Sequence, residues 1–463
     1  MNSNSIEADY LIVGAGTGGL AFADTLLGET DGSIIVVDER ARPGGHWNDA
    51  YRFVRLHQPS AYYGVNSISL GNDSIDVHGP NAGFYELATG AEVCAYFERL
   101  MDRILLPSGR VNYFPMCRYE GGGRFTSLVT GATHEVRVRK RIVDTTYVAG
   151  STPARHKPAY SIAAGVRHTP VAGLADLTSP ADTYVIVGAG KTGIDACLWL
   201  LDQGIDPDAI CWIMPQDAWL LNRAFSQPGD AFFEMVVNGL AAQMEAAAAA
   251  ESREDLFAWL EAQEALLRLD PGVAPTAYRC ASVNQWELQQ LRKIKNVVRL
   301  GRVKSIDSRQ IVLDRGQIAT SGSAMHVDCS AKGVAPRPVR PIFEGDRITV
   351  QFVRTCQPAF SAAFIAFVEA HYEAEAKKNA LCGVVQSPER DVDWMSMMLA
   401  NIMNAFAWST EPVLQQWLSQ ARLNGFSGLH KPNEALKPEQ RAARQRLRVA
   451  TPGAVANLRR LLG

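Results

Sequence analysis

The stretch GAGTGG at residues 14–19 follows the apolar residues 10–13 and precedes a helical pattern at residues 20–27. Its first glycine permits a tight turn from strand to helix. The second lets the backbone approach a pyrophosphate, and the third lets the helix pack closely on the strand. Phosphates would lie at the helix N-terminus, where free N–H groups and the helix dipole favour an anion. We therefore expect a dinucleotide-binding turn built on Gly14, Gly16 and Gly19.

A second copy of the pattern, GAGKTG, stands at residues 188–193 after the apolar residues 184–187. One such pattern is weak evidence, but two copies, each with a strand before it and a helix after it, strongly indicate two dinucleotide sites. The second site would use Gly188, Gly190, Lys191, Thr192 and Gly193. The sequence thus predicts an α/β protein that holds two dinucleotides and passes electrons between them.

Only the first pattern is followed by an acid where a ribose would sit. A strand expected at residues 33–37 ends at Asp38, about 20 residues beyond the glycine loop. A carboxylate there accepts a hydrogen bond from a free 2′-OH and repels a 2′-phosphate, which suits the adenosine of FAD or NAD. The alternative is an acid at a solvated strand end.

The residues after Asp38 resemble the E-x-x-x-x-x-G-G element of FAD-binding proteins, with Asp38 in place of the glutamate. This resemblance assigns the first site to FAD. The cofactor-binding candidates in this stretch are Arg40, Gly45, His46 and Trp47.

The second site lacks an acid at the end of the strand expected at residues 210–214. Lys191 and Arg223 offer cations for a 2′-phosphate, so the sequence favours NADPH. Asp217 lies near the expected position of a ribose-binding acid and keeps NADH as an alternative. A solvated loop lysine and a surface ion-pair partner are the alternatives for Lys191 and Arg223.

Composition narrows the class of protein. Of 463 residues, 47% are hydrophobic and 20% are charged, and the net charge of −2 suggests no affinity for nucleic acid or membranes. We expect neither a signal segment nor a membrane helix. The eight cysteines form no C-x-x-C or closely spaced pair, which excludes a redox-active pair of local spacing and argues against a metal site. Scattered unpaired cysteines fit a reducing cytoplasm.

The order of elements predicts two Rossmann-like domains with a helical insertion and a helical C-terminal region. Residues 1–150 and 325–385 would form the FAD domain, and residues 151–324 the NAD(P)H domain, with the insertion at residues 231–270. Residues 386–463 would form the helical C-terminal region. The insertion would pack on the sheet or act as a lid, and the Met- and aromatic-rich C-terminal stripe would be core, a pocket roof or a dimer face.

Several finer expectations follow from local patterns. Residues 150–180, rich in Pro, Gly and Ser, are interpreted as a linker, and a hairpin is expected at residues 303–306 and 310–313. Strands are expected at residues 134–138 and 142–147. Residues 325–333 are expected to return the chain to the FAD domain.

Two glycine patterns 174 residues apart (Gly14 to Gly188), without redox cysteines, resemble the class B flavoprotein monooxygenases, which include the flavin-containing and N-hydroxylating monooxygenases. The GGHW at residues 44–47 is similar to their G-G-x-W, and residues 328–333 resemble a diverged A-T-G-type segment. Their F-x-G-x-x-x-H motif is absent, which disfavours Baeyer–Villiger chemistry.

The resemblance implies that NADPH reduces FAD and that O₂ then forms a flavin C4a-(hydro)peroxide, which oxygenates a small-molecule substrate, with N-hydroxylation favoured. One alternative is an NAD(P)H:FAD oxidoreductase that moves hydride without oxygen insertion. Baeyer–Villiger oxygenation and a non-catalytic nucleotide-sensing protein are further alternatives. The expected partners are small molecules, and a homodimer is open.

Two segments are candidates for the flavin edge. The polar stretch at residues 54–63 follows GGHW, and there Gln58 would hold the flavin N5/C4a edge while His57 donates to the peroxide or the substrate. The loop at residues 354–357 precedes a helix whose N-terminus would stabilise negative charge at flavin N1 and C2=O, with Gln357 as a cofactor contact. The alternative for residues 54–63 is a polar loop closed by its own hydrogen bonds, and the alternative for residues 354–357 is an ordinary strand–helix loop.

Overall fold

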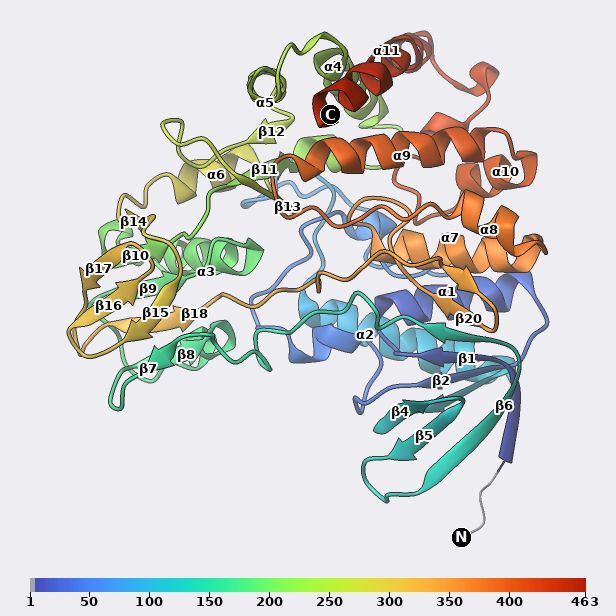
Figure 1. Cartoon of the computed structure of the whole chain (residues 1–463), viewed down its shortest axis with the longest axis horizontal. Helices are drawn as coiled ribbons and strands as arrows, with labels where there is room; N and C mark the ends of the chain where they lie inside the picture. Colours follow the sequence, from blue (N-terminus) through green and yellow to red (C-terminus); the bar gives the residue numbers. More distant parts are fainter. Residues whose placement is uncertain (1–4) are drawn as a thin grey trace.

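The computed structural model describes residues 5–463, and one of its layers is a sheet built around the first glycine loop (Figure 1). β1 (Ser5–Val13) leads into α1 (Thr17–Glu29), which returns the chain to β2 (Ile34–Val37). Every residue of β2 is buried, as in a parallel strand covered on both faces. The sheet adds β3 (Val111–Phe114), β6 (Thr133–Asp144), β19 (Phe343–Glu344) and β20 (Arg347–Thr349), in the order β19-β20-β6-β1-β2-β3.

The first domain also contains one long strand, a hairpin and several helices. The two strands expected at residues 134–138 and 142–147 are the single strand β6, which also pairs with the hairpin of β4 (Cys117–Gly121) and β5 (Arg124–Ser127). On the sheet, α1 packs against α7 (Pro358–His371), so residues far apart in the chain form one core. Another helix of this domain is α2 (Gly90–Leu100), which begins with a Thr89–Glu92 capping box.

The second glycine loop has its own parallel sheet. β9 (Tyr184–Val187) leads into α3 (Lys191–Asp202) and then β10 (Ile210–Ile213), as the sequence predicts. The sheet order is β14-β10-β9-β18-β8, where the added strands are β8 (His168–Pro170), β14 (Val297–Val298) and β18 (Met325–Asp328). A second sheet joins β7 (Ser161–Ile162), β15 (Val303–Ile306), β16 (Gln310–Leu313) and β17 (Gly316–Ala319), which confirms the expected hairpin.

One boundary of the predicted domains is wrong, and so is the interpretation of residues 150–180 as a linker. β18 pairs with β9 and β8, so residues 325–328 belong to the second nucleotide sheet and not to the first domain. The chain rejoins the first sheet only at β19 and β20. Residues 150–180 are not a plain linker, because β7 and β8 each pair with a strand of the second domain.

A separate three-stranded sheet lies beside the helical insertion. β13 (Ala277–Val283) runs parallel to β11 (Ala218–Asn222), and β12 (Leu266–Leu267) closes the other edge of β11. The insertion itself forms α4 (Phe233–Ala249) and α5 (Arg253–Ala262). Leu256 and Leu260 of α5 are buried, whereas Trp259 is 47% exposed.

The C-terminal region consists of α9 (Asp393–Ser409), α10 (Pro412–Gln420) and α11 (Pro438–Leu462), joined to the first domain through α8 (Glu375–Leu381). Trp408 of α9 packs against Phe360 and Phe364 of α7. α11 packs along α4 and also contacts α9 (Figure 1). The sequence predicts that the Met- and aromatic-rich stripe is core, a pocket roof or a dimer face. The core alternative is confirmed for the buried residues Trp394, Met395, Met397 and Trp408, whereas Met403 and Phe406 are exposed. Within residues 5–463, no helix combines the length and apolarity needed to cross a bilayer.

Asn404 ties α9 to the loop that precedes α7. Its side-chain amide donates to the Val353 carbonyl at 2.8 Å and to the Gly383 carbonyl at 2.7 Å, and only 5% of Asn404 is exposed. Both carbonyls would lose their donor in an Asn404→Leu variant. Buried carbonyls without partners are unfavourable, so this asparagine fixes the position of the C-terminal region.

We predict that Asn404→Leu lowers the free energy of unfolding by about 1–3 kcal/mol, because two buried acceptors are left unpaired. Urea unfolding followed by tryptophan fluorescence measures the effect, since Trp394 and Trp408 lie on the same helix. Met403→Ala on the exposed face of α9 is the control and should change stability by less than about 0.5 kcal/mol. Equal effects of the two substitutions would contradict the assignment.

Candidate active site

The first glycine loop has the geometry of a pyrophosphate site. Gly14 has φ +101°, and a Cβ added there would lie 2.7 Å from Thr145 Oγ1. A Cβ at Gly19 would overlap the Gly14 carbonyl at 1.8 Å, whereas one at Gly16 would meet nothing closer than Gly45 Cα at 3.5 Å. No side chain caps the N-terminus of α1. The roles predicted for these glycines therefore fit the structure, and α1 offers free N–H groups to an anion.

Asp38 stands at the end of β2 and faces the loop. Its carboxylate accepts the Ala15 N–H at 2.6 Å and the Arg40 N–H at 2.7 Å, and burial raises the pKa of Asp38. A carboxylate can accept about four hydrogen bonds, so ribose hydroxyls fit its remaining lone pairs. The Arg40 side chain instead pairs with Asp49 at 2.7 Å, where it holds the GGHW turn rather than pointing a free cation at a ligand.

The GGHW turn is tied directly to the glycine loop. Trp47 Nε1 donates to the Tyr63 hydroxyl at 2.8 Å, and that hydroxyl lies 2.7 Å from Thr17 Oγ1. His46 stacks obliquely near Trp47, with 5.1 Å between ring centroids. His46 has an accessible surface, yet the protein around it excludes enough water to lower its pKa to about 4. The turn is thus held against the predicted pyrophosphate position.

The second glycine loop repeats this geometry with more open space. Gly188 has φ +132°, and its Cβ would lie 2.4 Å from the Cys329 carbonyl; a Cβ at Gly193 would lie 2.3 Å from the Gly188 carbonyl. A Cβ at Gly190 would meet nothing within 4 Å, and no side chain caps α3. This is a cradle that a pyrophosphate can fill. At the same helix end Thr192 is half-buried and Lys191 pairs with Asp195.

Residues 51–58 connect the two loops. Tyr51 donates its hydroxyl to Asp195 of α3 at 2.6 Å, and the Phe53 ring stacks on Trp199 of α3 with centroids 4.8 Å apart. At the other end of the segment, the Ser282 hydroxyl of β13 donates to the His57 carbonyl. Sequence reasoning missed Tyr51 and Phe53, because no local pattern pairs them with a helix about 140 residues away.

His57 lies where the two domains meet. The surrounding protein, followed by the positive charges of Lys191 and Arg223, lowers the pKa of His57 to about 3, although its ring keeps an accessible surface. The imidazole is therefore neutral at physiological pH and can both donate and accept a hydrogen bond. Gln58 follows it and is half-buried. The effect of the Lys191 charge places His57 near the second glycine loop.

Arg223 is placed differently from the prediction. It is 1% exposed and pairs with Glu287 at 2.7 Å, with a further hydrogen bond to Asn81 Oδ1 at 3.2 Å. Glu287 also closes the Asn284 capping box of α6 (Gln285–Leu291). Neither a 2′-phosphate contact nor a surface ion pair fits this burial, so we correct both interpretations. The sequence distance to Glu287 hid the partner.

Another arginine stands at the end of β10. Arg279 Nη2 donates to Gln216 Oε1 at 2.9 Å, three residues beyond the last residue of the strand. Asp217, the candidate acid, is 8% exposed and is held by Arg299 at 2.8 Å. The structure thus neutralises the acid and brings a half-buried cation, which also pairs with Glu389 at 3.6 Å, to the position where a ribose phosphate is expected.

The loop at residues 354–357 contains two groups that suit an anionic or polar ligand. Gln357 Oε1 is buried without a hydrogen-bond partner in the described part of the chain, directly before Pro358 begins α7. The Arg354 guanidinium lies 3.8 Å from the Phe360 ring centroid and 5.2 Å from that of Trp408, and it donates to Asn424 Oδ1 at 2.6 Å. Burial lowers the pKa of Arg354 to about 9, so it stays charged at pH 7.

Arg354 makes no ion pair with any residue between 5 and 463. A desolvated cation without a counter-charge is unfavourable, and an anionic group nearby relieves that penalty. The loop therefore fits the expectation that it faces negative charge. Over the same described range, no cluster of His, Cys, Asp and Glu has the geometry of a metal site.

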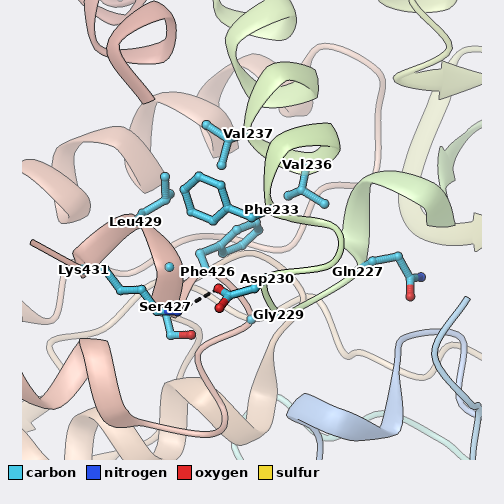
Figure 2. A pocket seen from close by; sticks show the side chains of 12 residues that line it. Gln227, Gly229, Asp230, Phe233, Val236, Val237, Phe426, Ser427, Leu429 and Lys431 are labelled. Atoms are coloured by element: carbon cyan, nitrogen blue, oxygen red, sulfur yellow. Dashed lines mark hydrogen bonds and ion pairs between the residues drawn. The ribbon is translucent and has the colours of Figure 1, made fainter. Parts of the chain in front are cut away.

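A cavity of about 200 Å³ lies between the start of α4 and the C-terminal segment at residues 425–431. Figure 2 shows Phe233, Val236 and Val237 of α4 near Leu429 and Phe426, with the Asp230–Lys431 ion pair (2.7 Å) at one side. Three of its lining residues connect it to the site. The Gln227 side chain accepts a hydrogen bond from the Tyr85 N–H and donates one to the Arg223 carbonyl. Gly425 lies against the Tyr62 ring. The Phe426 ring centroid lies 5.5 Å from the Arg354 guanidinium.

The cysteine expectation needs a correction. Cys280 of β13 and Cys356 of the 354–357 loop form a disulfide, although 76 residues separate them. The other six cysteines are free thiols: Cys94, Cys117, Cys197, Cys211, Cys329 and Cys382. No pair of local spacing exists, as predicted, but the fold makes a pair from distant residues.

Comparisons with known proteins agree with this architecture. Residues 12–75 match a family model described as an NAD(P)-binding Rossmann-like domain. The chain is 48% identical over 435 residues to the uncharacterized protein Rv2000 of Mycobacterium tuberculosis, covering 93% of this chain and 81% of that protein. The uncharacterized protein Mb2023 of Mycobacterium bovis matches to the same extent.

Among solved structures, the polycyclic ketone monooxygenase of the fungus Thermothelomyces thermophila aligns with a TM-score of 0.51 at 11% identity, covering 99% of this chain and 89% of that one. A cyclohexanone monooxygenase aligns with a TM-score of 0.49 at 12% identity, over 98% and 99% of the two chains. At such low identity the fungal match shows the fold alone. The expected fold, that of the flavin-dependent monooxygenases, is confirmed.

Gly16 and Gly190 provide a matched pair of tests, because both have room for a Cβ and neither has a positive φ. We predict that Gly16→Ala weakens flavin retention on the order of tenfold, since a methyl group would enter the space of charge-assisted phosphate contacts. Gly190→Ala should instead weaken nicotinamide dinucleotide binding by a similar factor with the flavin retained. Flavin absorbance per chain and dinucleotide titration measure the two effects.

Gly322→Ala is the control, since its Cβ also meets nothing within 4 Å and it lies outside both loops. It should change neither ligand. Loss of flavin from Gly190→Ala, or unchanged flavin content in Gly16→Ala, would overturn the assignment of the two sites.

Proposed function

We propose, from the premise that this chain belongs to the family of Rv2000 and has the flavin monooxygenase fold, that it is an NADPH-dependent FAD monooxygenase acting on a small molecule. FAD would bind the first glycine loop and NADPH the second. The observation that carries the proposal is the segment at residues 51–58, which follows the GGHW turn and docks on α3 through Tyr51 and Asp195. His57 would then lie where both dinucleotides present their reacting ends.

The first site would hold FAD through the N-terminus of α1, with Asp38 on the ribose and Gln357 supplying its buried free acceptor to the isoalloxazine. When bound, FAD supplies the two-electron chemistry that accepts hydride from NADPH and activates O₂. The chain's own contribution is to bind, to orient and to exclude water.

Three side chains have distinct roles in this arrangement. Arg354 would stabilise negative charge on the reduced flavin, since its guanidinium lacks an acidic partner in the region from residue 5 onward. Gln58 would hydrogen-bond the flavin edge. His57, held neutral at physiological pH, would donate a hydrogen bond to the bound oxygen or the substrate and would not act as a resident cation.

The substrate would enter through the cavity next to α4 (Figure 2). Its apolar lining of Phe233, Val236, Val237, Phe426 and Leu429 suits a small, mainly apolar molecule. Heteroatom oxidation, in particular N-hydroxylation, is the reaction we favour, because the sequence lacks the F-x-G-x-x-x-H motif. Hydride transfer without oxygen insertion is the alternative that the first experiment separates.

Stopped-flow absorbance of NADPH-reduced protein mixed with O₂ tests this function. We predict a transient species, distinct from both oxidised and reduced flavin, that persists while NADP⁺ is bound and is followed by oxygenated product when an amine substrate is present. Return of oxidised flavin with stoichiometric hydrogen peroxide, with and without candidate substrates, would instead identify an oxidoreductase that only moves hydride.

Arg279 provides the test of NADPH preference. We predict that Arg279→Gln raises the Kd for NADPH about tenfold and leaves that for NADH unchanged, since a charge-assisted phosphate contact contributes about 1.5–3 kcal/mol. Dinucleotide titration of the flavin-loaded protein measures both constants. The control is Arg302→Gln, because Arg302 lies on the exposed surface. Arg223 is buried and is therefore not suitable as a control position. Equal weakening of both dinucleotides would refute the assigned role.

A further inference from the structure

The Cys280–Cys356 disulfide joins the two sides of the candidate site. Cys280 belongs to β13, beside the insertion, and Cys356 belongs to the loop that leads into α7 of the first domain. The residue after Cys356 is Gln357, whose buried acceptor suits the flavin. The bond is thus the covalent connection between a strand of the insertion sheet and the loop assigned to the flavin edge.

β13 is deformed at the cysteine. Trp219 of β11 pairs with Tyr278, and Leu221 pairs with Ser282, so three residues of β13 stand opposite the single residue Leu220. Cys280 is the middle one and has φ +55°. Such bulges redirect a side chain away from the regular strand pattern, and this one turns Cys280 toward the loop.

Cys356 is also in the left-handed region, with φ +52°. This conformation is unfavourable for any residue with a Cβ, and strained residues of this kind gather at functional sites. Both partners of one disulfide therefore sit in backbone conformations that the fold must enforce. Opening the bond removes one of the constraints that enforce them.

The neighbours of the two cysteines are residues of the site. On β13, Arg279 bonds Gln216 at the end of β10, and Ser282 bonds the His57 carbonyl. On the loop, the Thr355 N–H donates to Asn401 Oδ1 of α9 at 3.1 Å. A change in the bond between the cysteines would therefore be felt at both dinucleotide positions.

The two sulfurs differ in access. Cys356 is half-buried, whereas Cys280 is 6% exposed. A small nucleophile would reach Cys356 first and leave Cys280 as the departing sulfur. Among the free cysteines, burial raises the pKa values of Cys197, Cys211, Cys329 and Cys382, so these thiols are poor competitors in exchange.

We propose that Cys280–Cys356 is a redox-active disulfide whose co-substrate is a small-molecule thiol, and that its opening releases the 354–357 loop from β13. The thiolate of the co-substrate attacks Cys356 Sγ, the S–S bond breaks, and Cys280 leaves as a thiolate that takes up a proton. A second thiol then attacks the mixed disulfide and frees Cys356. Two electrons and two protons enter the protein, and the co-substrate leaves as its own disulfide.

Thiol counting on the full-length native protein tests the proposal without any cofactor, so its failure is distinguishable from failure of the proposed function. Protein purified without reductant is treated with glutathione, quenched with acid, and alkylated in denaturant. The expected count rises from six to eight thiols per chain, and mass spectrometry places both new labels on Cys280 and Cys356. Eight thiols before treatment, or no rise until denaturant is added, would overturn the proposal.

A second arm identifies the source of electrons. NADPH added anaerobically to flavin-loaded protein, without any thiol, replaces glutathione in the same assay. Six thiols after NADPH and eight after glutathione support the thiol co-substrate. Eight thiols after NADPH alone would show that the bound nucleotides reduce the disulfide and would overturn the thiol assignment.

The structural consequence is measured by hydrogen exchange. Amides of residues 354–357 and 279–282 should exchange faster after reduction, and a Cys280→Ser/Cys356→Ser double variant should reproduce this faster exchange without reductant. Cys94→Ser, which removes a half-buried free thiol, is the matched control and should leave exchange unchanged. Unchanged exchange in both the reduced protein and the double variant would refute release of the loop.

Discussion

The candidate site depends on how residues 51–58 of the first domain dock on the helix of the second glycine loop. A hydrogen bond from Tyr51 to Asp195 and the stacking of Phe53 on Trp199 fix this contact. Since Asp195 also holds Lys191, one carboxylate orients both the bridging segment and the cation at the start of α3. Each glycine loop could form without the other, and this contact joins the first domain directly to the helix of the second loop. The positions of the polar residues that follow, including His57, depend on this contact.

The parts of the candidate site whose local geometry follows from the sequence are those that obey local rules. A strand, three spaced glycines and a helix define each loop within about 30 residues. Steric crowding at Gly19 and Gly193 leaves no room for a residue with a Cβ. Asp38 was found for the same reason, because the geometry of the motif fixes its distance from the loop. The GGHW turn and the segment after it could also be placed next to the first loop, since they are close to it in the chain.

The errors share a different physical origin, namely partners that lie far away in the sequence. The sequence suggests an exposed cation at Arg223 because its partner Glu287 is 64 residues away, and a free acid at Asp217 because Arg299 is 82 residues away. The same holds for the disulfide, whose partners come from strand β13 and from the loop before α7, 76 residues apart. The sequence does not predict the domain of β18 correctly, because the pattern of a short apolar strand does not indicate which sheet the strand joins. Charge and redox state at a site are properties of the assembled fold.

The Arg354 guanidinium has a consequence for stability as well as for chemistry. It packs against Phe360 and Trp408, and it bonds Asn424 of the C-terminal segment, so three separate parts of the chain meet around one positive charge. A ligand that brings negative charge to this point binds the folded form and not the unfolded chain, which shifts the folding equilibrium toward the native state. Occupancy of the site and cohesion between α7, α9 and the C-terminal segment are therefore thermodynamically linked.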